Sequence, residues 1–161
     1  MKLLRKILTT GRVTRPSSED PPSAIPGGDR AALCGSLHIR HVDAGSCNGC
    51  ELEVNSIFGP VYDAERFGIK LVASPRHADA LTVTGPVTKN MALPLVKAFE
   101  ATPAPKLVIA LGDCACDRGV FRGGYGVEGA VRDVVPVDLE VPGCPPEPDV
   151  ILRALRGVVG R

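Results

Sequence analysis

The sequence predicts an α/β fold with an open parallel β-sheet that helices cover on both faces. Short apolar runs, typical of buried strands, alternate along the chain with segments of helical periodicity. The strand-like runs are nearly continuous in apolar residues, as expected where both faces of a parallel sheet are covered. Aromatic residues make up only 4% of the chain, so aliphatic side chains must fill the core, which favours close-packed strands and helices.

The clearest buried strand is the run KLVIALG at 106–112. Other strands are predicted at 37–45, 69–74 and 78–85, with a last one inside 133–143. Helical spacing of apolar residues predicts helices at 51–60, 89–101 and 151–159. These elements form a single predicted domain at 37–161.

An extended N-terminal tail, 1–36, precedes this domain. Residues 1–10 would place apolar and basic side chains on opposite faces of a short amphipathic helix. The segment 15–28 (RPSSEDPPSAIPGG) is rich in Pro, Ser and charge, and is predicted to be a linker. The helix is either a frayed terminus or a docking element for a membrane-associated partner, and the sequence leaves both readings open.

Composition excludes several functional classes. A net charge of +1 gives no reason to expect binding to nucleic acid, and the few aromatic residues do not suit a stacking platform for single strands. The basic start lacks the apolar run of a secretory signal, and no apolar run is as long as a membrane span. We therefore expect a cytoplasmic protein whose six cysteines serve metal or redox chemistry rather than disulfides.

Four cysteines follow predicted strands at the point where each strand ends. Cys47 and Cys50 come after the first strand, Cys114 follows the strand at 106–112, and Cys144 follows the last strand. Because the carboxyl ends of parallel strands meet at one edge of a sheet, the four thiols are expected to converge there. Four thiolates suit one [4Fe–4S] cluster, and the neighbouring glycines would let the backbone approach it.

Two other kinds of site remain open at this point. Structural zinc also takes four cysteines, usually as two close pairs, whereas only Cys47 and Cys50 form such a pair. A thioredoxin-type dithiol would use that pair alone and leave Cys114 and Cys144 without a role. Cys34 and Cys116 are interpreted as incidental or packing thiols, and Cys114 is preferred over Cys116 because it lies immediately past the strand end.

Two further patterns are given no functional role. Gly124, Gly126 and Gly129 match G-x-G-x-x-G, but they lie well after a strand instead of directly behind the first one. That stretch is interpreted as a flexible loop and not as a nucleotide site. The three histidines show no metal-ligand spacing, and His41, on or near the first strand, is interpreted as a packing or surface residue.

Four stretches of the chain resemble one known superfamily, over about 40–155. They are HVDAGSCNGCELE, ERFGIKLVASPRHADALTVTGPVT, GDCA and VPVDLEVPGCPPEP. Their order is similar to that in the small subunits of nickel–iron hydrogenases and in the 20 kDa subunit of NADH:ubiquinone oxidoreductase (complex I). Complex I has two adjacent cysteines at the first motif. The spacing of Cys47 and Cys50 instead resembles the membrane-bound energy-converting hydrogenases and formate hydrogenlyase.

The resemblance implies an iron–sulfur subunit of a multi-subunit oxidoreductase, and we expect a flavodoxin-like fold. The cofactor- and metal-binding residues would be Cys47, Cys50, Cys114 and Cys144, holding one [4Fe–4S] cluster next to the active site of a large catalytic subunit. That subunit would resemble either the hydrogenase large subunit or the 49 kDa subunit of complex I. The chain itself would carry no catalytic residue and would have no activity alone.

The resemblance also implies further partners and a location. A ferredoxin-like iron–sulfur subunit and membrane subunits would complete the assembly, the latter through the N-terminal helix. The complex would lie peripherally on the inner, cytoplasmic face of the cell membrane. Whether the large subunit holds nickel–iron or binds quinone stays open. The alternative function is a zinc-binding structural or assembly module without redox activity.

Overall fold

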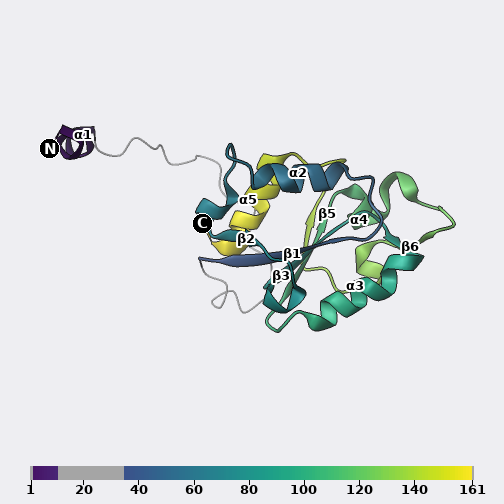
Figure 1. The fold of residues 1–161 in the computed structure, drawn as a ribbon. Coiled ribbons are helices and arrows are strands. Elements are labelled where there is room, and N and C mark those ends of the chain that lie inside the picture. The colour runs from purple at the N-terminus through teal and green to yellow at the C-terminus, as the bar shows by residue number, and fades with distance from the viewer. Residues whose placement is uncertain (1, 11–34, 161) are drawn as a thin grey trace.

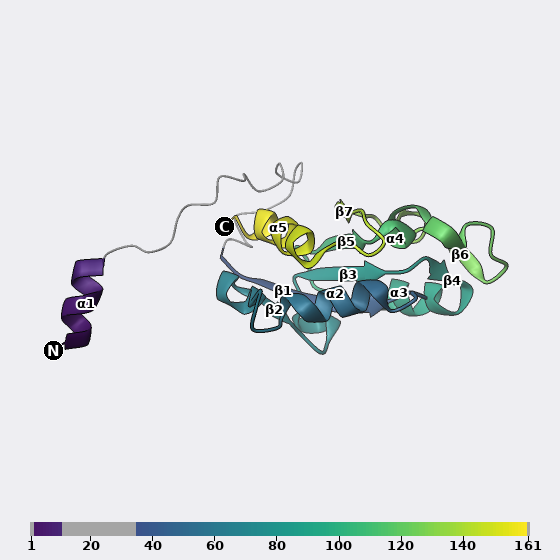
Figure 2. The same cartoon turned by 90° about the horizontal axis from the view of Figure 1, so that it is seen from above.

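The computed structural model describes residues 2–10 and 35–160, and within them a five-stranded parallel sheet forms the centre of the fold (Figure 1). The strand order is β2-β1-β3-β5-β7, which Figure 2 shows from one edge to the other. If these five strands are numbered 1 to 5 in chain order, their order in the sheet is 2-1-3-4-5, which is the order of flavodoxin-like folds. The predicted fold class is therefore confirmed. Their bounds are Leu37–Asp43 (β1), Ile69–Leu71 (β2), Ala80–Thr84 (β3), Leu107–Leu111 (β5) and Leu139–Val141 (β7).

Helices cover both faces of this sheet. Helices α2 (Gly49–Ile57) and α5 (Pro148–Val159) pack on one face, and α3 (Lys89–Ala101) and the short α4 (Asp113–Asp117) pack on the other (Figure 1). Single 3₁₀ turns connect these elements at Ala64–Phe67, Pro75–His77, Gly119–Phe121 and Val131–Asp133. The described part of the chain has no helix that is long and apolar enough to cross a membrane.

The core consists of two apolar clusters, one on each face of the sheet. Ile39 and Leu111 meet Ile57 of α2 and Leu155 of α5 in the first cluster. The second cluster joins strand residues such as Leu81 to side chains of α3 and α4. Alternate strand residues thus enter opposite clusters, as the pleat requires.

Most predicted elements are present, with shifted ends. Helix α3 has the predicted bounds, whereas α2 begins two residues earlier than the predicted start. The strand predicted at 69–74 is only Ile69–Leu71, and the last strand is confined to Leu139–Val141. The predicted N-terminal helix forms as α1 (Lys2–Thr10), on which Leu4 and Leu8 are exposed. The predicted linker 15–28 and Cys34 lie outside the described residues.

One sequence interpretation is wrong in part. The glycine-rich stretch interpreted as a flexible loop contains a strand, β6 (Val127–Gly129), which pairs antiparallel with β4 (Val87–Thr88). Gly129 lies opposite Val87 in this ladder. The partner strand is about forty positions away in sequence, so local periodicity gave no sign of the pairing.

Candidate metal centre

The four cysteines singled out from the sequence all lie at the carboxyl edge of the sheet. Cys47 follows β1, and Cys50 is the second residue of α2. Cys114 is the second residue of α4, directly after β5, and Cys144 follows β7. Since β1, β5 and β7 run parallel in one sheet, the loops that carry these thiols leave from the same edge.

One backbone and one side-chain hydrogen bond tie two of these loops together. The Asp113 amide donates to the Gly143 carbonyl oxygen at 2.8 Å, and the Gly143 amide donates to Asp113 Oδ1 at 2.7 Å. Asp113 immediately precedes Cys114, and Gly143 immediately precedes Cys144. The reciprocal pair therefore fixes the two cysteines relative to each other.

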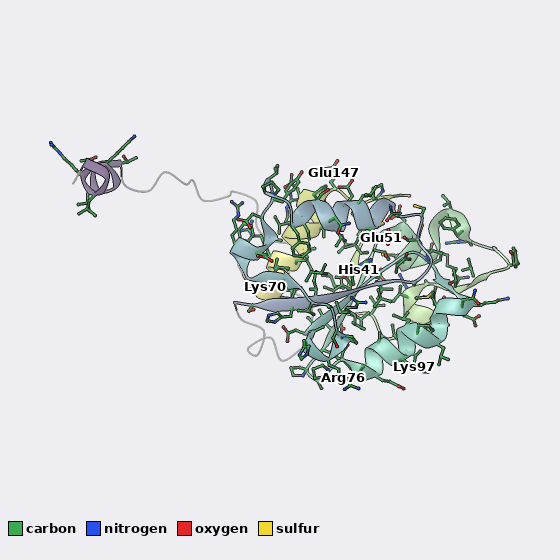
Figure 3. The ribbon with its side chains drawn as sticks, in the orientation of Figure 1. His41, Glu51, Lys70, Arg76, Lys97 and Glu147 are labelled. Carbon is green, nitrogen blue, oxygen red and sulfur yellow. The ribbon has the colours of Figure 1, made fainter. Side chains whose placement is uncertain are left out.

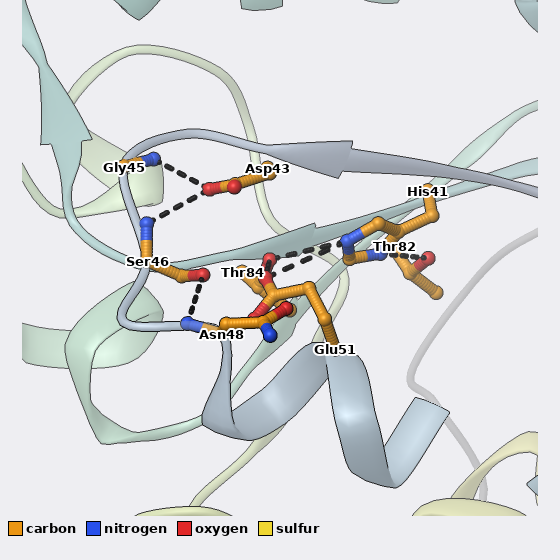
Figure 4. A network of polar contacts seen from close by, with 8 residues as sticks. All are labelled: His41, Asp43, Gly45, Ser46, Asn48, Glu51, Thr82 and Thr84. Atoms are coloured by element: carbon orange, nitrogen blue, oxygen red, sulfur yellow. Dashed lines mark hydrogen bonds and ion pairs between the residues drawn. The ribbon is translucent and has the colours of Figure 1, made fainter. Parts of the chain in front are cut away.

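A separate set of hydrogen bonds holds the loop of Cys47. Asp43 Oδ1, at the end of β1, accepts from the amides of Gly45 and Ser46, each at 2.8 Å (Figure 4). Ser46 Oγ in turn accepts from the Asn48 amide at 3.1 Å. The chain is thus turned directly from β1 into the start of α2, which positions Cys50 in the first turn of that helix.

Two glycines leave room for the sulfur atoms. A Cβ at Gly112, whose φ is +92°, would lie 2.5 Å from Cys50 Sγ. A Cβ at Gly119, whose φ is +46°, would lie 2.9 Å from Cys114 Sγ. Both distances are shorter than real Cβ contacts, and both φ values favour glycine, so a side chain at either position would displace a sulfur.

The thiols also act on one another electrostatically. Burial is the main cause that raises the pKa of the Cys50 thiol to about 12, and negative charge on Glu51, Cys114, Cys47 and Cys144 adds to it in that order. Burial likewise raises the pKa of Cys114, with Cys144 as the largest charge contribution, while a backbone hydrogen bond with Val120 acts in the opposite direction. Positive charge brought among these sulfurs would relieve the repulsion between thiolates, which is what a bound metal does.

The site is buried on one side and open on the other. Cys50 and Cys114 are only 9% and 8% exposed, whereas Cys47 and Cys144 are exposed. All four thiols are free. Within residues 2–10 and 35–160, no group of three or more His, Cys, Asp or Glu side chains is arranged to hold a single metal ion. Four free thiols on loops from one sheet edge are the kind of donor set that a [4Fe–4S] cluster takes.

Cys116 lies apart from these four residues. Helix geometry places residues two positions apart about 200° around the axis, so Cys114 and Cys116 point to opposite sides of α4. Cys116 is buried in the apolar cluster beneath α3, and its Sγ lies 3.7 Å from the Ala110 carbonyl oxygen. Burial, then Glu140 and Asp113, raise the pKa of Cys116 to about 11, while Arg132 acts in the opposite direction. The interpretation of Cys116 as a packing thiol agrees with this position.

The sequence reasoning missed a buried polar group next to the site. Glu51 follows Cys50 and lies under the first turn of α2 with His41 of β1 and Thr84 of β3 (Figure 4). His41 and Glu51 are half-buried, whereas Lys97 is exposed (Figure 3). Threonines inside a fully buried strand were the available signal, since a hydroxyl there needs a partner.

Comparison with known proteins identifies the family. A family model described as NADH ubiquinone oxidoreductase, 20 Kd subunit, matches residues 47–158, a span that begins at the first of the four cysteines. The chain belongs to this family. The resemblance seen in the sequence motifs is thereby confirmed.

Curated relatives share close to half of their aligned residues with this chain. Formate hydrogenlyase subunit 7 of Escherichia coli is 46% identical over 78% of the chain, and the match covers 49% of that relative. A probable membrane-bound hydrogenase subunit of Pyrococcus furiosus is 53% identical over 73% of the chain and 70% of its own length. The chain thus spans about half of the formate hydrogenlyase subunit.

Solved structures support the same fold. The membrane-bound sulfane sulfur reductase, an archaeal respiratory membrane complex, contains a chain that superposes with a TM-score of 0.69 at 30% identity, covering 81% of this chain and 75% of that one. An NAD⁺-reducing [NiFe]-hydrogenase contains one with a TM-score of 0.56 at 20% identity, over 78% of this chain and 93% of that one. The second match is evidence for the fold alone.

Proposed function

We propose that this chain is the electron-transfer subunit of a multi-subunit oxidoreductase, and that Cys47, Cys50, Cys114 and Cys144 hold one [4Fe–4S] cluster. The observation that carries the proposal is that four free thiols lie on loops from one sheet edge, where Gly112 and Gly119 leave room for the sulfurs of Cys50 and Cys114. When bound, such a cluster supplies a centre that takes up and releases one electron at a time.

In this proposal, the residues of the chain bind the cluster, shield its inner side and hold its orientation. Cys50 and Cys114 anchor the inner side of the site from the starts of α2 and α4. The backbone hydrogen bond between Val120 and Cys114 stabilises negative charge on that sulfur. Cys47 and Cys144 hold the exposed side, so an electron can enter or leave there over a short distance.

The names of the relatives support the class of assembly. Relatives include subunits of formate hydrogenlyase, of a membrane-bound hydrogenase and of NADH-quinone oxidoreductase. By analogy this chain works beside a large catalytic subunit, with a ferredoxin-like iron–sulfur subunit and membrane subunits, at the cytoplasmic face of the membrane. The sequence of the large subunit decides between nickel–iron and quinone chemistry, because paired cysteines are needed to hold nickel.

An exposed apolar segment beside Cys114 supports a partner at this edge. Val120 is 80% exposed, Tyr125 is 96% exposed and Phe121 is partly exposed, all between α4 and β6. Large apolar side chains exposed next to a redox site are typical of a surface that a partner covers. Coverage here would also exclude water and oxidants from the exposed cysteines.

The first test measures metal content and ligand identity together. Chain prepared anaerobically should contain about four iron and four sulfide ions, and serine at Cys50 or Cys114 should abolish or convert its EPR signal. Cys116→Ser is the matched control, since Cys116 lies on the same helix and is 8% exposed like Cys114. Stoichiometric zinc in fresh anaerobic protein would instead support the zinc module. Loss of the cluster in Cys116→Ser but not in Cys114→Ser would overturn the ligand assignment.

The second test concerns the partner surface. Val120→Asp should weaken co-purification of the large subunit at least several-fold, because it puts a charge into an apolar contact. Val61→Asp is the control, because Val61 is also 80% exposed but follows the far end of α2. Equal loss of assembly in both variants, with the iron content of each unchanged, would remove this surface from the proposal.

A further inference from the structure

Glu51 is an acidic side chain enclosed next to the candidate metal centre. Its side chain is 13% exposed, and Oε2 is buried without a hydrogen-bond partner. The Thr84 hydroxyl donates to Oε1, and His41 Nε2 lies 3.6 Å from the same oxygen (Figure 4). The carboxylate is therefore held on one oxygen by the sheet, while its neighbour in the chain, Cys50, points to the metal centre.

Helix capping does not account for this arrangement. In a capping box, the acidic side chain at position N3 of a helix accepts a hydrogen bond from the backbone amide of the N-cap residue. Glu51 is at N3 of α2 and Asn48 is the N-cap, but the Asn48 amide donates to Ser46 Oγ instead. Glu51 turns inward to β1 and β3, so its carboxylate is buried at a position where it could have remained solvated.

The neighbouring histidine brings no fixed positive charge to the Glu51 carboxylate. Burial is the largest influence on His41 and lowers its pKa, and Arg40 also lowers it, while Glu51 and Asp43 raise it. The net lowering favours neutral imidazole, which contributes a dipole to Glu51 but no positive charge. Thr84 Oγ1 lies 3.3 Å from His41 Nε2, so the contacts of Glu51 Oε1 are with a hydroxyl and an imidazole.

We propose that Glu51 is a positioning residue for the redox site: its buried carboxylate keeps a fixed negative charge beside Cys50 and lowers the reduction potential of the cluster that the four cysteines hold. The proposal rests on the proposed function. Reduction adds one electron from a neighbouring redox centre of the assembly, and no bond to Glu51 forms or breaks. A nearby negative charge opposes the added electron, most strongly where burial weakens screening.

The test is an EPR-monitored redox titration of the anaerobically purified complex. In Glu51→Gln, which keeps the shape and removes the charge, the midpoint potential should become more positive. The ratio of reduced to oxidised cluster at the wild-type midpoint should rise on the order of tenfold, equivalent to about 59 mV for one electron. Glu51→Asp retains the charge and should stay closer to wild type. Glu100→Gln, the same charge change at the far end of α3, should leave the potential unchanged.

A wild-type potential in Glu51→Gln, or an equal shift in Glu100→Gln, would overturn the proposal. If Glu51→Gln does not assemble the cluster, Thr84→Val decides the question. Thr84→Val keeps the Glu51 carboxylate and removes the hydroxyl that donates to it, so the midpoint potential of the cluster should become more negative. An unchanged or more positive potential would contradict the role of Glu51. Absence of any iron–sulfur EPR signal in the wild-type complex would instead count against the proposed function itself.

Discussion

The two faces of strand β3 differ in chemistry although both are buried. On the face toward α3, Leu81 and Val83 are fully buried among apolar side chains. On the face toward α2, Thr82 and Thr84 are equally buried, but their hydroxyls lie near His41. Threonine and valine have nearly the same shape, so packing alone does not require threonine on that face.

The difference follows the position of the candidate metal centre. The polar cluster of His41, Glu51, Thr82 and Thr84 lies under the start of α2, which carries Cys50. Further along the same face, the side chains beneath α2 and α5 are apolar again. One end of this face therefore serves the redox site, while the rest of both faces supplies the apolar burial that stabilises the fold.

The largest effect is expected where this face meets the sulfur atoms. Gly112→Ala should prevent cluster assembly, because the new Cβ would lie 2.5 Å from Cys50 Sγ. Gly123→Ala is the control, since Gly123 has a similar φ of +83° but nothing within 4 Å of a new Cβ. Iron content and EPR measure the outcome. Similar iron loss in both variants would show that backbone strain, and not contact with the sulfur, decides the result.

An intermediate effect is expected from exchanging the chemistry of the two faces. Val83→Thr would bury a hydroxyl among apolar side chains and should lower the free energy of unfolding by about 1–3 kcal/mol. Thr82→Val removes only a 3.4 Å contact with His41 Nδ1 and should change the free energy of unfolding by less than about 1 kcal/mol. Urea denaturation measures both values. The contrast between the faces would be contradicted by a larger loss in Thr82→Val than in Val83→Thr.

The smallest effect on the domain is expected from the N-terminal tail, because the described side chains of α1, including Leu4 and Leu8, are exposed. Deletion of residues 1–28 should leave the iron content and the urea midpoint unchanged. If α1 docks on a membrane partner through Leu4 and Leu8, the deletion should also reduce the share of the complex in the membrane fraction. Full membrane association after deletion would remove the docking role, and loss of iron would show that the tail belongs to the domain.

The sequence by itself determined the fold class and the position of the four cysteines. Periodicity is a local property, so the alternation of strands and helices could be predicted without knowledge of contacts. Because parallel strands end at one edge, cysteines that follow β1, β5 and β7 had to lie at that edge. The motifs around them were also sufficient to indicate the family that the comparison confirms.

Only the tertiary structure decided where individual side chains point. Asp113 and Gly143 are thirty residues apart, and the reciprocal hydrogen bonds between them fix where α4 begins. Because α4 begins there, Cys114 points to the site and Cys116 points to the core. The approach of α2 to β1 and β3 likewise brings Glu51 to His41. Such directions depend on contacts between distant segments, because a helix that starts one residue earlier rotates every side chain by about 100°.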